Sequence, residues 1–278
     1  MNAALHTDRH VPCHESQTMS FPDSFRLDGK RLFITGGSRG LGREMALAIA
    51  DAGADIALVA RPSDSLQATA EDIRALGRKA WTIEADIGDP QACESICHEA
   101  LDTCGPFDIL ISNVGGRRLS IPTEEMELEQ WKSLVDLNLT STFLCAKVIG
   151  GAMIARGTGG RIINIASINA MVPGRGIAGR HYETAKAGVL QLTRSLAVDW
   201  AQHRITVNAI CPGIFLTEPN KAWSKSHPEV IDGLLKNIPM GELGDPKDIG
   251  PLAVYLASDR AKYMTGASLV IDGGYTCW

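Results

Sequence analysis

The stretch RLFITGGSRGLGREMALAIADAGADIALVAR, residues 31–61, decides the fold. Its apolar runs Arg31–Thr35 and Asp55–Ala60 predict two strands, and the apolar spacing of Gly40–Ala52 between them predicts a helix. A strand such as Asp55–Ala60, apolar almost throughout, is typical of a parallel sheet that is covered on both faces. The stretch therefore predicts a right-handed strand–helix–strand unit.

The same alternation continues to the end of the chain. Further helices are expected at 64–76, 90–104, 128–149, 182–202 and near 249–256, and further strands at 80–84, 109–112, 161–166, 206–210 and 268–271. This order predicts the α/β class: a single-domain, Rossmann-type, doubly wound, seven-stranded parallel sheet flanked by helices. The expected domain covers residues 26–278, with a substrate-loop excursion at 213–246, and residues 1–25 are expected to be a disordered tail.

The first strand and helix are joined by the glycine loop Thr35-Gly36-Gly37-Ser38-Arg39-Gly40-Leu41-Gly42. Glycines at a strand-to-helix turn permit a tight turn and let the backbone approach a pyrophosphate. The helix N-terminus offers N–H donors and the positive end of its dipole to the same anion. The loop therefore predicts a dinucleotide site.

Basic residues accompany this loop. Arg61 ends the second strand, where sites that prefer NAD commonly place Asp or Glu for the ribose 2′-hydroxyl. With Arg39, Arg61 would pair with a 2′-phosphate, so NADP(H) is favoured over NAD(H). The alternative is that Arg61 stacks on the adenine or points to solvent. Asp86, after the third strand, is placed either to reach the adenine amino group or to cap a helix.

Tyr182 and Lys186 stand four residues apart at the start of an expected helix. Side chains at this spacing share a helix face, so the ammonium can act on whatever the phenol touches. A nearby cation lowers the pKa of a phenol toward the range in which proton transfer is efficient. The pair suggests acid–base chemistry, although an isolated pair of this kind is more often an ordinary surface feature.

Together with other motifs, these features resemble the short-chain dehydrogenase/reductase family over residues 27–278. The glycine loop matches the family's T-G-x-x-x-G-x-G motif, and Tyr182 and Lys186 match its Y-x-x-x-K motif. Further matches are Asn113-Val114-Gly115 for its N-A-G motif, with valine in place of alanine, Asn138 for its asparagine, Ser167 for its serine, Pro212, Gly213 and Thr217 for its P-G-x-x-x-T segment, and the closing Asp272-Gly273-Gly274. The chain is similar to gluconate 5-dehydrogenases and to 3-oxoacyl-carrier-protein reductases.

The resemblance implies an NAD(P)-dependent oxidoreductase that moves a hydride between nicotinamide and a carbonyl or secondary alcohol. Tyr182 would exchange a proton with the substrate oxygen, and Ser167 would hydrogen-bond that oxygen. Lys186 would bind the nicotinamide ribose and lower the pKa of Tyr182, while Asn138 would hold a water that links Lys186 to solvent. The implied cofactor contacts are Thr35, Gly36, Ser38, Arg39, Gly40, Leu41, Gly42, Arg61, Asp86, Ile87, Asn113, Gly115, Tyr182, Lys186, Pro212, Gly213, Ile214 and Thr217.

Basic residues also cluster around the expected substrate mouth: Arg117, Arg118, Arg175, Arg180 and His181. Arginine forks suit carboxylates and phosphates, which favours an anionic substrate such as a keto acid, a sugar acid, a carboxylated terpenoid or an acyl thioester. The alternative is a set of solvated charges paired with Glu124, Glu125 or Glu183. The segment between Ser167 and Tyr182 is longer than is usual in the family, and we place the extra length at 175–180.

Two other functions are kept as alternatives. A bulky apolar alcohol or ketone, steroid- or terpenoid-like, could be framed by Phe215, Leu216, Trp223 and Met240. A nucleotide-sensing regulator that has lost catalysis would predict a broken Ser/Tyr/Lys set, whereas every member is present here. Assembly into a dimer or tetramer through the two long helices, 128–149 and 182–202, and the C-terminal strand and tail is implied by the resemblance.

Composition favours a soluble, cytoplasmic protein whose partner is a small molecule. A net charge of −5 over 278 residues gives no general affinity for nucleic acid or anionic membranes. The N-terminus lacks the apolar segment of a secretory signal, and no apolar run suggests a membrane helix. The odd number of cysteines, 7, argues against a disulfide framework. No metal is expected, since nothing around His6, His10, Cys13, His14 and Glu15 would fix ligand geometry.

Overall fold

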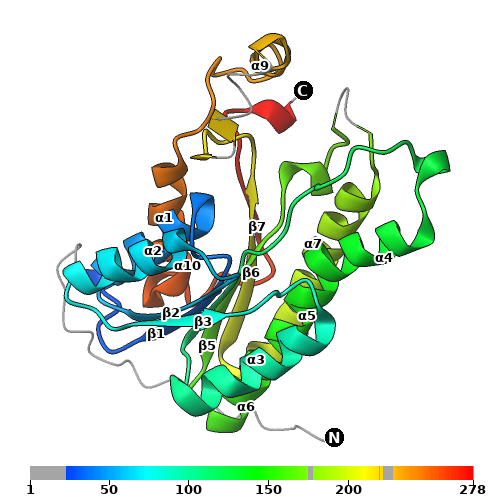
Figure 1. The fold of residues 1–278 in the computed structure, drawn as a ribbon. Coiled ribbons are helices and arrows are strands. Elements are labelled where there is room, and N and C mark those ends of the chain that lie inside the picture. The colour runs from blue at the N-terminus through cyan, green and yellow to red at the C-terminus, as the bar shows by residue number, and fades with distance from the viewer. Residues whose placement is uncertain (1–22, 175–177, 219, 222–227, 278) are drawn as a thin grey trace, which may run out of the picture.

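Parallel strands form one sheet in the order β3-β2-β1-β4-β5-β6-β7, with helices on both faces (Figure 1). The computed structural model describes residues 23–174, 178–218, 220–221 and 228–277. The strands are β1 (Arg31–Thr35), β2 (Asp55–Ala60), β3 (Ala80–Glu84), β4 (Ile109–Ser112), β5 (Gly160–Ile165), β6 (Ile205–Pro212) and β7 (Ser268–Ile271). The expected doubly wound, seven-stranded α/β fold is confirmed.

The helices alternate with these strands as the sequence predicted, except for α9, which lies in the excursion where only a loop was expected. They are α1 (Gly40–Asp51), α2 (Asp64–Ala75), α3 (Pro90–Thr103), α4 (Leu128–Val135), α5 (Ser141–Cys145), α6 (Gly151–Arg156), α7 (His181–Trp200), α9 (Pro228–Leu235) and α10 (Ile249–Ala257). The expected tail and its histidines lie almost wholly outside the described residues. At the base of the excursion that follows β6, Phe215 pairs with Gly244, so the segment leaves and returns at one point.

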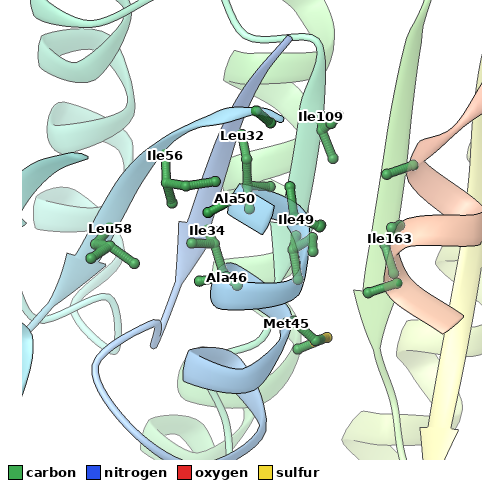
Figure 2. Close-up of a cluster of buried hydrophobic side chains, with 14 of the residues drawn as sticks. Leu32, Ile34, Met45, Ala46, Ile49, Ala50, Ile56, Leu58, Ile109 and Ile163 are labelled. Atoms are coloured by element: carbon green, nitrogen blue, oxygen red, sulfur yellow. The ribbon is translucent and has the colours of Figure 1, made fainter. Parts of the chain in front are cut away.

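Successive side chains of each strand face opposite sides of the sheet and build two apolar layers. On one side, Leu32 and Ile34 of β1 pack against Met45 and Ile49 of α1, as Figure 2 shows, and α10 completes this layer. On the other side, Phe33 of β1 belongs to a second layer formed with α3, α5 and α6. Burial of each such side chain contributes about 1.5–3 kcal/mol, which fixes both helix layers against the strands.

The strand order reverses between β1 and β4, because β1 has β2 on one side and β4 on the other. In open α/β sheets a ligand binds in the crevice at this point, beyond the carboxyl ends of the strands. Here the loops after β1 and β4 are tied together: Thr35 Oγ1 accepts from the Asn113 N–H at 3.0 Å, and Asn113 Nδ2 donates to the Gly36 carbonyl at 3.1 Å.

The expected helix 128–149 is longer than the sequence indicated. The helical run extends over Leu128–Arg156, with π-helical turns at Asp136–Thr140 and Ala146–Gly150. Gly150 resembles a helix end in sequence, but it is buried within the run, where an added Cβ would lie 2.6 Å from the Trp200 ring. Glycine is needed here because an aromatic side chain of α7 packs against the backbone.

This run is also the one described helix that is long and apolar enough to cross a membrane, with a mean hydropathy of 1.4 over its most apolar window. The sequence analysis did not expect a helix of this length and apolar character. More than half of that window, 56 %, is buried inside the protein, and Val148, Ile149 and Met153 pack against the sheet. Its apolar character is therefore accounted for as that of a core helix.

The cysteines of the described residues are all free thiols. Cys93, Cys97 and Cys145 meet in the second apolar layer, where Cys145 Sγ lies 3.8 Å from each of the other two sulfur atoms. All three are buried, so they pack there as small apolar side chains.

Candidate active site

A cleft of about 1090 Å³ lies at the carboxyl edge of the sheet. Its walls come from the loops that follow β1 to β6 in the chain. The glycine loop forms part of one wall, and Ser167, Tyr182 and Lys186 line the same cleft. The topology thus joins segments that are nearly 150 residues apart in the sequence into one site.

The glycine loop makes the tight turn that its glycines predicted. Gly36 has φ +69°, a region that residues with a Cβ seldom adopt. A Cβ on Gly42 would collide with the Gly36 carbonyl oxygen, so glycine lets the start of α1 fold tightly onto the loop. The N-terminus of α1 opens into the cleft beside Ser38 and Gly40. This arrangement leaves room for a pyrophosphate next to unpaired backbone N–H groups.

The cleft wall around α2 carries the expected arginines and two serines that the sequence analysis missed. Arg39 and Arg61 are exposed and line the cleft, and Ser63 and Ser65 lie beside them. Ser63 caps α2 by accepting from the Leu66 N–H at 3.3 Å, and its hydroxyl lies 3.1 Å from that of Ser65. The sequence could have indicated Ser63 as the residue that caps α2, because a serine directly before an apolar helical run is a typical N-cap.

Asp86 lines the cleft after β3 and accepts from the Gly88 N–H at 2.9 Å. Asp89 rather than Asp86 caps α3. Of the residues expected at the cofactor, those that line the cleft are Gly36, Ser38, Arg39, Gly40, Leu41, Gly42, Arg61, Asp86, Ile87, Asn113, Gly115, Tyr182, Lys186, Pro212, Gly213 and Thr217. Thr35, which is buried, and Ile214, whose carbonyl accepts from the Gly244 N–H at 3.0 Å, do not line the cleft.

Of the four expected catalytic side chains, three lie in two neighbouring parts of the fold. Ser167 follows β5, while Tyr182 and Lys186 lie in the first two turns of α7. Lys186 is 2 % exposed, and its Nζ donates to the Ile165 carbonyl at 2.8 Å and lies 6.0 Å from the Tyr182 ring centroid. The lysine is therefore fixed between the end of β5 and the phenol.

Asn138 is fully buried in the first π-helical turn and does not line the cleft. Its Oδ1 accepts from the Gly116 N–H at 2.8 Å, and its Nδ2 donates to the carbonyls of Leu134 and Gly116 at 2.9 Å and 3.1 Å. The side chain thus holds the loop after β4 in place. Its expected part in holding a water stays a prediction.

Burial dominates the titration of both catalytic groups. It raises the pKa of Tyr182 above the ordinary value, against the lowering effects of the Ser167 hydrogen bond and the Arg117 charge. It also lowers the pKa of Lys186 to about 8. The sequence analysis expected Lys186 to lower the pKa of Tyr182. The pKa of Tyr182 is raised because burial outweighs the Ser167 hydrogen bond and the Arg117 charge, and the effect expected of Lys186 itself stays a prediction.

The basic residues near the substrate mouth divide into two groups. Arg117 and Arg180 both pair with Glu183, at 3.2 Å and 2.8 Å, so one of the expected carboxylate partners engages two of them. His181 is buried and bonds through Nε2 to the Arg117 carbonyl at 3.0 Å. Arg118 is the one member of the described part of this group that lines the cleft. Arg175 lies outside the described residues.

Arg118 has φ +59°, the left-handed region that residues other than glycine seldom adopt. This turn of the backbone separates two adjacent arginines, one facing the cleft and one facing Glu183.

Among the apolar residues suggested for a bulky substrate, Phe215 is buried against Gly244, Met240 is exposed, and neither lines the cleft. Leu216 also lies outside the cleft wall, and Trp223 lies outside the described residues.

Comparison with known proteins shows which proteins this chain resembles over most of its length. Residues 36–276 match the family model described as "Enoyl-(Acyl carrier protein) reductase". Galactitol 2-dehydrogenase of Rhizobium johnstonii is 34% identical over 263 residues, covering 94% of this chain and 100% of that protein. Gluconate 5-dehydrogenase of Gluconobacter oxydans is 35% identical over 258 residues, covering 93% of this chain and 99% of that protein.

Two solved structures resemble the whole described fold. A short-chain type dehydrogenase/reductase from Mycobacterium marinum has a TM-score of 0.84 and 38% identity, and the match covers 94% of this chain and 100% of that one. A gluconate 5-dehydrogenase from Burkholderia cenocepacia, in complex with NADP and tartrate, has a TM-score of 0.84 and 34% identity, with 92% and 99% covered.

Proposed function

Because this chain belongs to the short-chain dehydrogenase/reductase family and is an oxidoreductase that acts on CH–OH groups, we propose that it oxidises or reduces a polyhydroxylated substrate, a polyol, sugar or sugar acid, with NADP(H) favoured over NAD(H). One observation carries the proposal. Ser167, Tyr182 and Lys186 line the same cleft as the glycine loop. Relatives named for galactitol and gluconate, and a relative that holds tartrate, support the substrate class.

The residues of the cleft fit a dinucleotide. The pyrophosphate would lie at the α1 N-terminus, and Arg39, Arg61, Ser63 and Ser65 would surround a 2′-phosphate. When bound, the nicotinamide would accept or supply the hydride. The chain's own groups would manage the proton: the Tyr182 hydroxyl would exchange it with the substrate oxygen, and the Ser167 hydroxyl would stabilise charge on that oxygen.

The function is tested by assaying the purified full chain with polyols, sugar acids, acyl thioesters and bulky ketones, each with both cofactors. We expect the highest kcat/KM with a polyol, sugar or sugar acid. Higher activity with a bulky apolar ketone would favour the alternative substrate class. Cofactor binding without turnover of any of them would favour the nucleotide-sensing regulator.

The cofactor preference rests on Arg61, and the variant Arg61→Asp tests it. We expect the wild type to have the higher kcat/KM with NADPH. In the variant this value should fall roughly 10- to 100-fold, since each lost charge-assisted hydrogen bond costs about 1.5–3 kcal/mol. The value with NADH should change little or rise. Arg260→Asp, an exposed arginine outside the cleft, is the matched control. An NADH preference in the wild type would contradict the proposal.

The charge of the substrate is tested at Arg118, which lines the cleft. Asparagine is the replacement of choice because it tolerates the left-handed backbone found there. If the enzyme binds a sugar acid, Arg118→Asn should raise KM for the acid about tenfold and leave KM for the neutral polyol nearly unchanged. The control Arg180→Asn removes an arginine that is already paired. Equal effects on acid and polyol would argue against recognition of a carboxylate.

We also propose a homo-oligomer, a dimer or tetramer, built through the helical run Leu128–Arg156 and α7. Exposed apolar side chains on these helices, Leu128, Phe143 and Val198, support an interface there.

The free thiols of the described cysteines fit a reducing compartment, so the cytoplasm is the proposed location.

A further inference from the structure

The guanidinium of Arg117 lies over the ring of Tyr182, with Cζ 5.0 Å from the ring centroid. A cation within about 6 Å of an aromatic face is attracted by the electrons of the ring. The Arg117 side chain is only 16% exposed, so water screens this contact weakly. A partly buried guanidinium therefore rests on the phenol that is expected to carry out proton transfer.

Arg117 is held in this place by several partners. Its Nη1 donates to the carbonyls of Ala178 and Gly179, at 3.2 Å and 2.8 Å. Its Nη2 donates to Glu183 at 3.2 Å and more weakly to Asn169 at 3.4 Å. These partners belong to the long segment before α7, to the first turn of α7 and to the loop after β5. The position of the guanidinium is thus determined by the fold.

The charge of Arg117 is only partly cancelled by Glu183. That carboxylate also accepts from the Gly174 N–H and from Arg180, each at 2.8 Å, and its side chain is 11% exposed. Burial raises the pKa of Glu183, but the Gly174 N–H and the two arginines outweigh it and bring the pKa below the ordinary value. One carboxylate shared between two arginines leaves the group of three with a net positive charge beside the phenol.

We propose that Arg117 is a positioning residue that holds the Tyr182 ring and supplies a permanent positive charge to its phenolate. The proposal rests on the proposed function, in which Tyr182 exchanges the proton. It assigns to Arg117 a role different from the substrate contact that the sequence suggested, and it leaves Arg118 to face the substrate.

The other groups around Tyr182 do not replace this charge. Lys186, on the same helix, lies farther from the ring, at 6.0 Å, and because burial lowers its pKa to about 8 it loses its proton as the pH rises through that value. An arginine stays protonated throughout this range. Ser167, after β5, offers a neutral hydroxyl. Burial raises the pKa of Cys211 on β6 to about 11, and neither form of a thiol carries a positive charge.

The sign of the effect follows from the charge. A cation stabilises the phenolate, so it lowers the pKa of Tyr182 relative to the value that burial alone would set. Oxidation of an alcohol needs the deprotonated phenol. Removal of Arg117 should therefore move the rise of kcat/KM with pH to higher pH.

The test compares Arg117→Met, Arg117→Lys and Glu183→Gln with the wild type, by the pH profile of kcat/KM for alcohol oxidation. Arg117→Met should shift the profile upward by roughly half to one pH unit, and Arg117→Lys should shift it less. Glu183→Gln, which removes the counter-charge but keeps an acceptor for the Gly174 N–H, should shift it downward. Arg180→Met removes a positive charge from the same group of three but has no ring contact among its described partners, so it should shift the profile upward less than Arg117→Met does.

A second readout does not depend on activity. The ultraviolet titration of tyrosinate, taken as the difference between each protein and the same protein carrying Tyr182→Phe, reports the pKa of this one phenol. We expect the difference curve of Arg117→Met to move to higher pH. A curve that does not move would overturn the proposal, and so would a kcat/KM reduced equally at every pH. If Tyr182→Phe retained turnover, the part proposed for Tyr182 in proton exchange would fail instead, while the titration would still test whether Arg117 lowers the pKa of this phenol.

Discussion

Replacement of Tyr182 by phenylalanine should remove turnover, by a factor of roughly 10²–10⁴ or more, and leave NADPH binding nearly intact. The substitution deletes one hydroxyl, which is the group proposed to exchange the proton with the substrate oxygen. The ring itself remains, so its contacts with Arg117 and Lys186 remain as well. The rest of the cleft wall, from the glycine loop to Thr217, is untouched. The loss should therefore lie in kcat and not in cofactor affinity.

The measurement pairs steady-state rates with a fluorescence titration of NADPH. Tyr255→Phe is a matched control, because that tyrosine lies on α10 and packs against Phe25, away from the cleft. It should leave kcat within about twofold of the wild-type value, as is usual for substitutions away from a site. Persistent turnover in Tyr182→Phe would show that another group carries the proton.

The sequence predicted the fold well because the strands are buried on both faces. The run Asp55–Ala60 is apolar after its first residue, and its ends in the structure are those that the sequence indicated. The glycine loop was equally informative, since Gly36 and Gly42 occupy positions where a Cβ is disfavoured or excluded. Such local requirements can be recognised in a sequence without knowing what lies nearby in space.

Features that depend on distant neighbours could not be predicted. The helical run continues through Gly150 because Trp200 packs there, and the π-helical turn at Asn138 leaves no pattern in residue type. Arg117 and Arg118 are adjacent and chemically identical, yet one pairs with Glu183 and the other lines the cleft. The left-handed backbone at Arg118 separates them, and residue type alone does not indicate it.

Gly115 shows how closely the backbone approaches the expected catalytic groups. A Cβ at this position would lie 2.7 Å from Asn138 Oδ1 and 2.8 Å from Lys186 Nζ. Both distances are shorter than a carbon normally tolerates, so Gly115→Ala must displace one of these side chains. Asn138 is held by three hydrogen bonds to Gly116 and Leu134. The lysine, whose Nζ has one described hydrogen bond, to the Ile165 carbonyl, should move instead.

Gly115→Ala should therefore lower kcat by roughly 10²-fold, as expected for a catalytic group misplaced by about 1 Å. Overpacking should also lower the free energy of unfolding by about 1–3 kcal/mol. Thermal denaturation separates this cost from the loss of rate, because assays well below the Tm sample only folded enzyme. Gly151→Ala is the matched control: that glycine is helical, an added Cβ meets nothing within 4 Å, and alanine should stabilise the helix by up to about 1 kcal/mol. Wild-type kcat in Gly115→Ala would mean that the position of the Lys186 ammonium does not limit the reaction, and the part assigned to that lysine would have to be withdrawn.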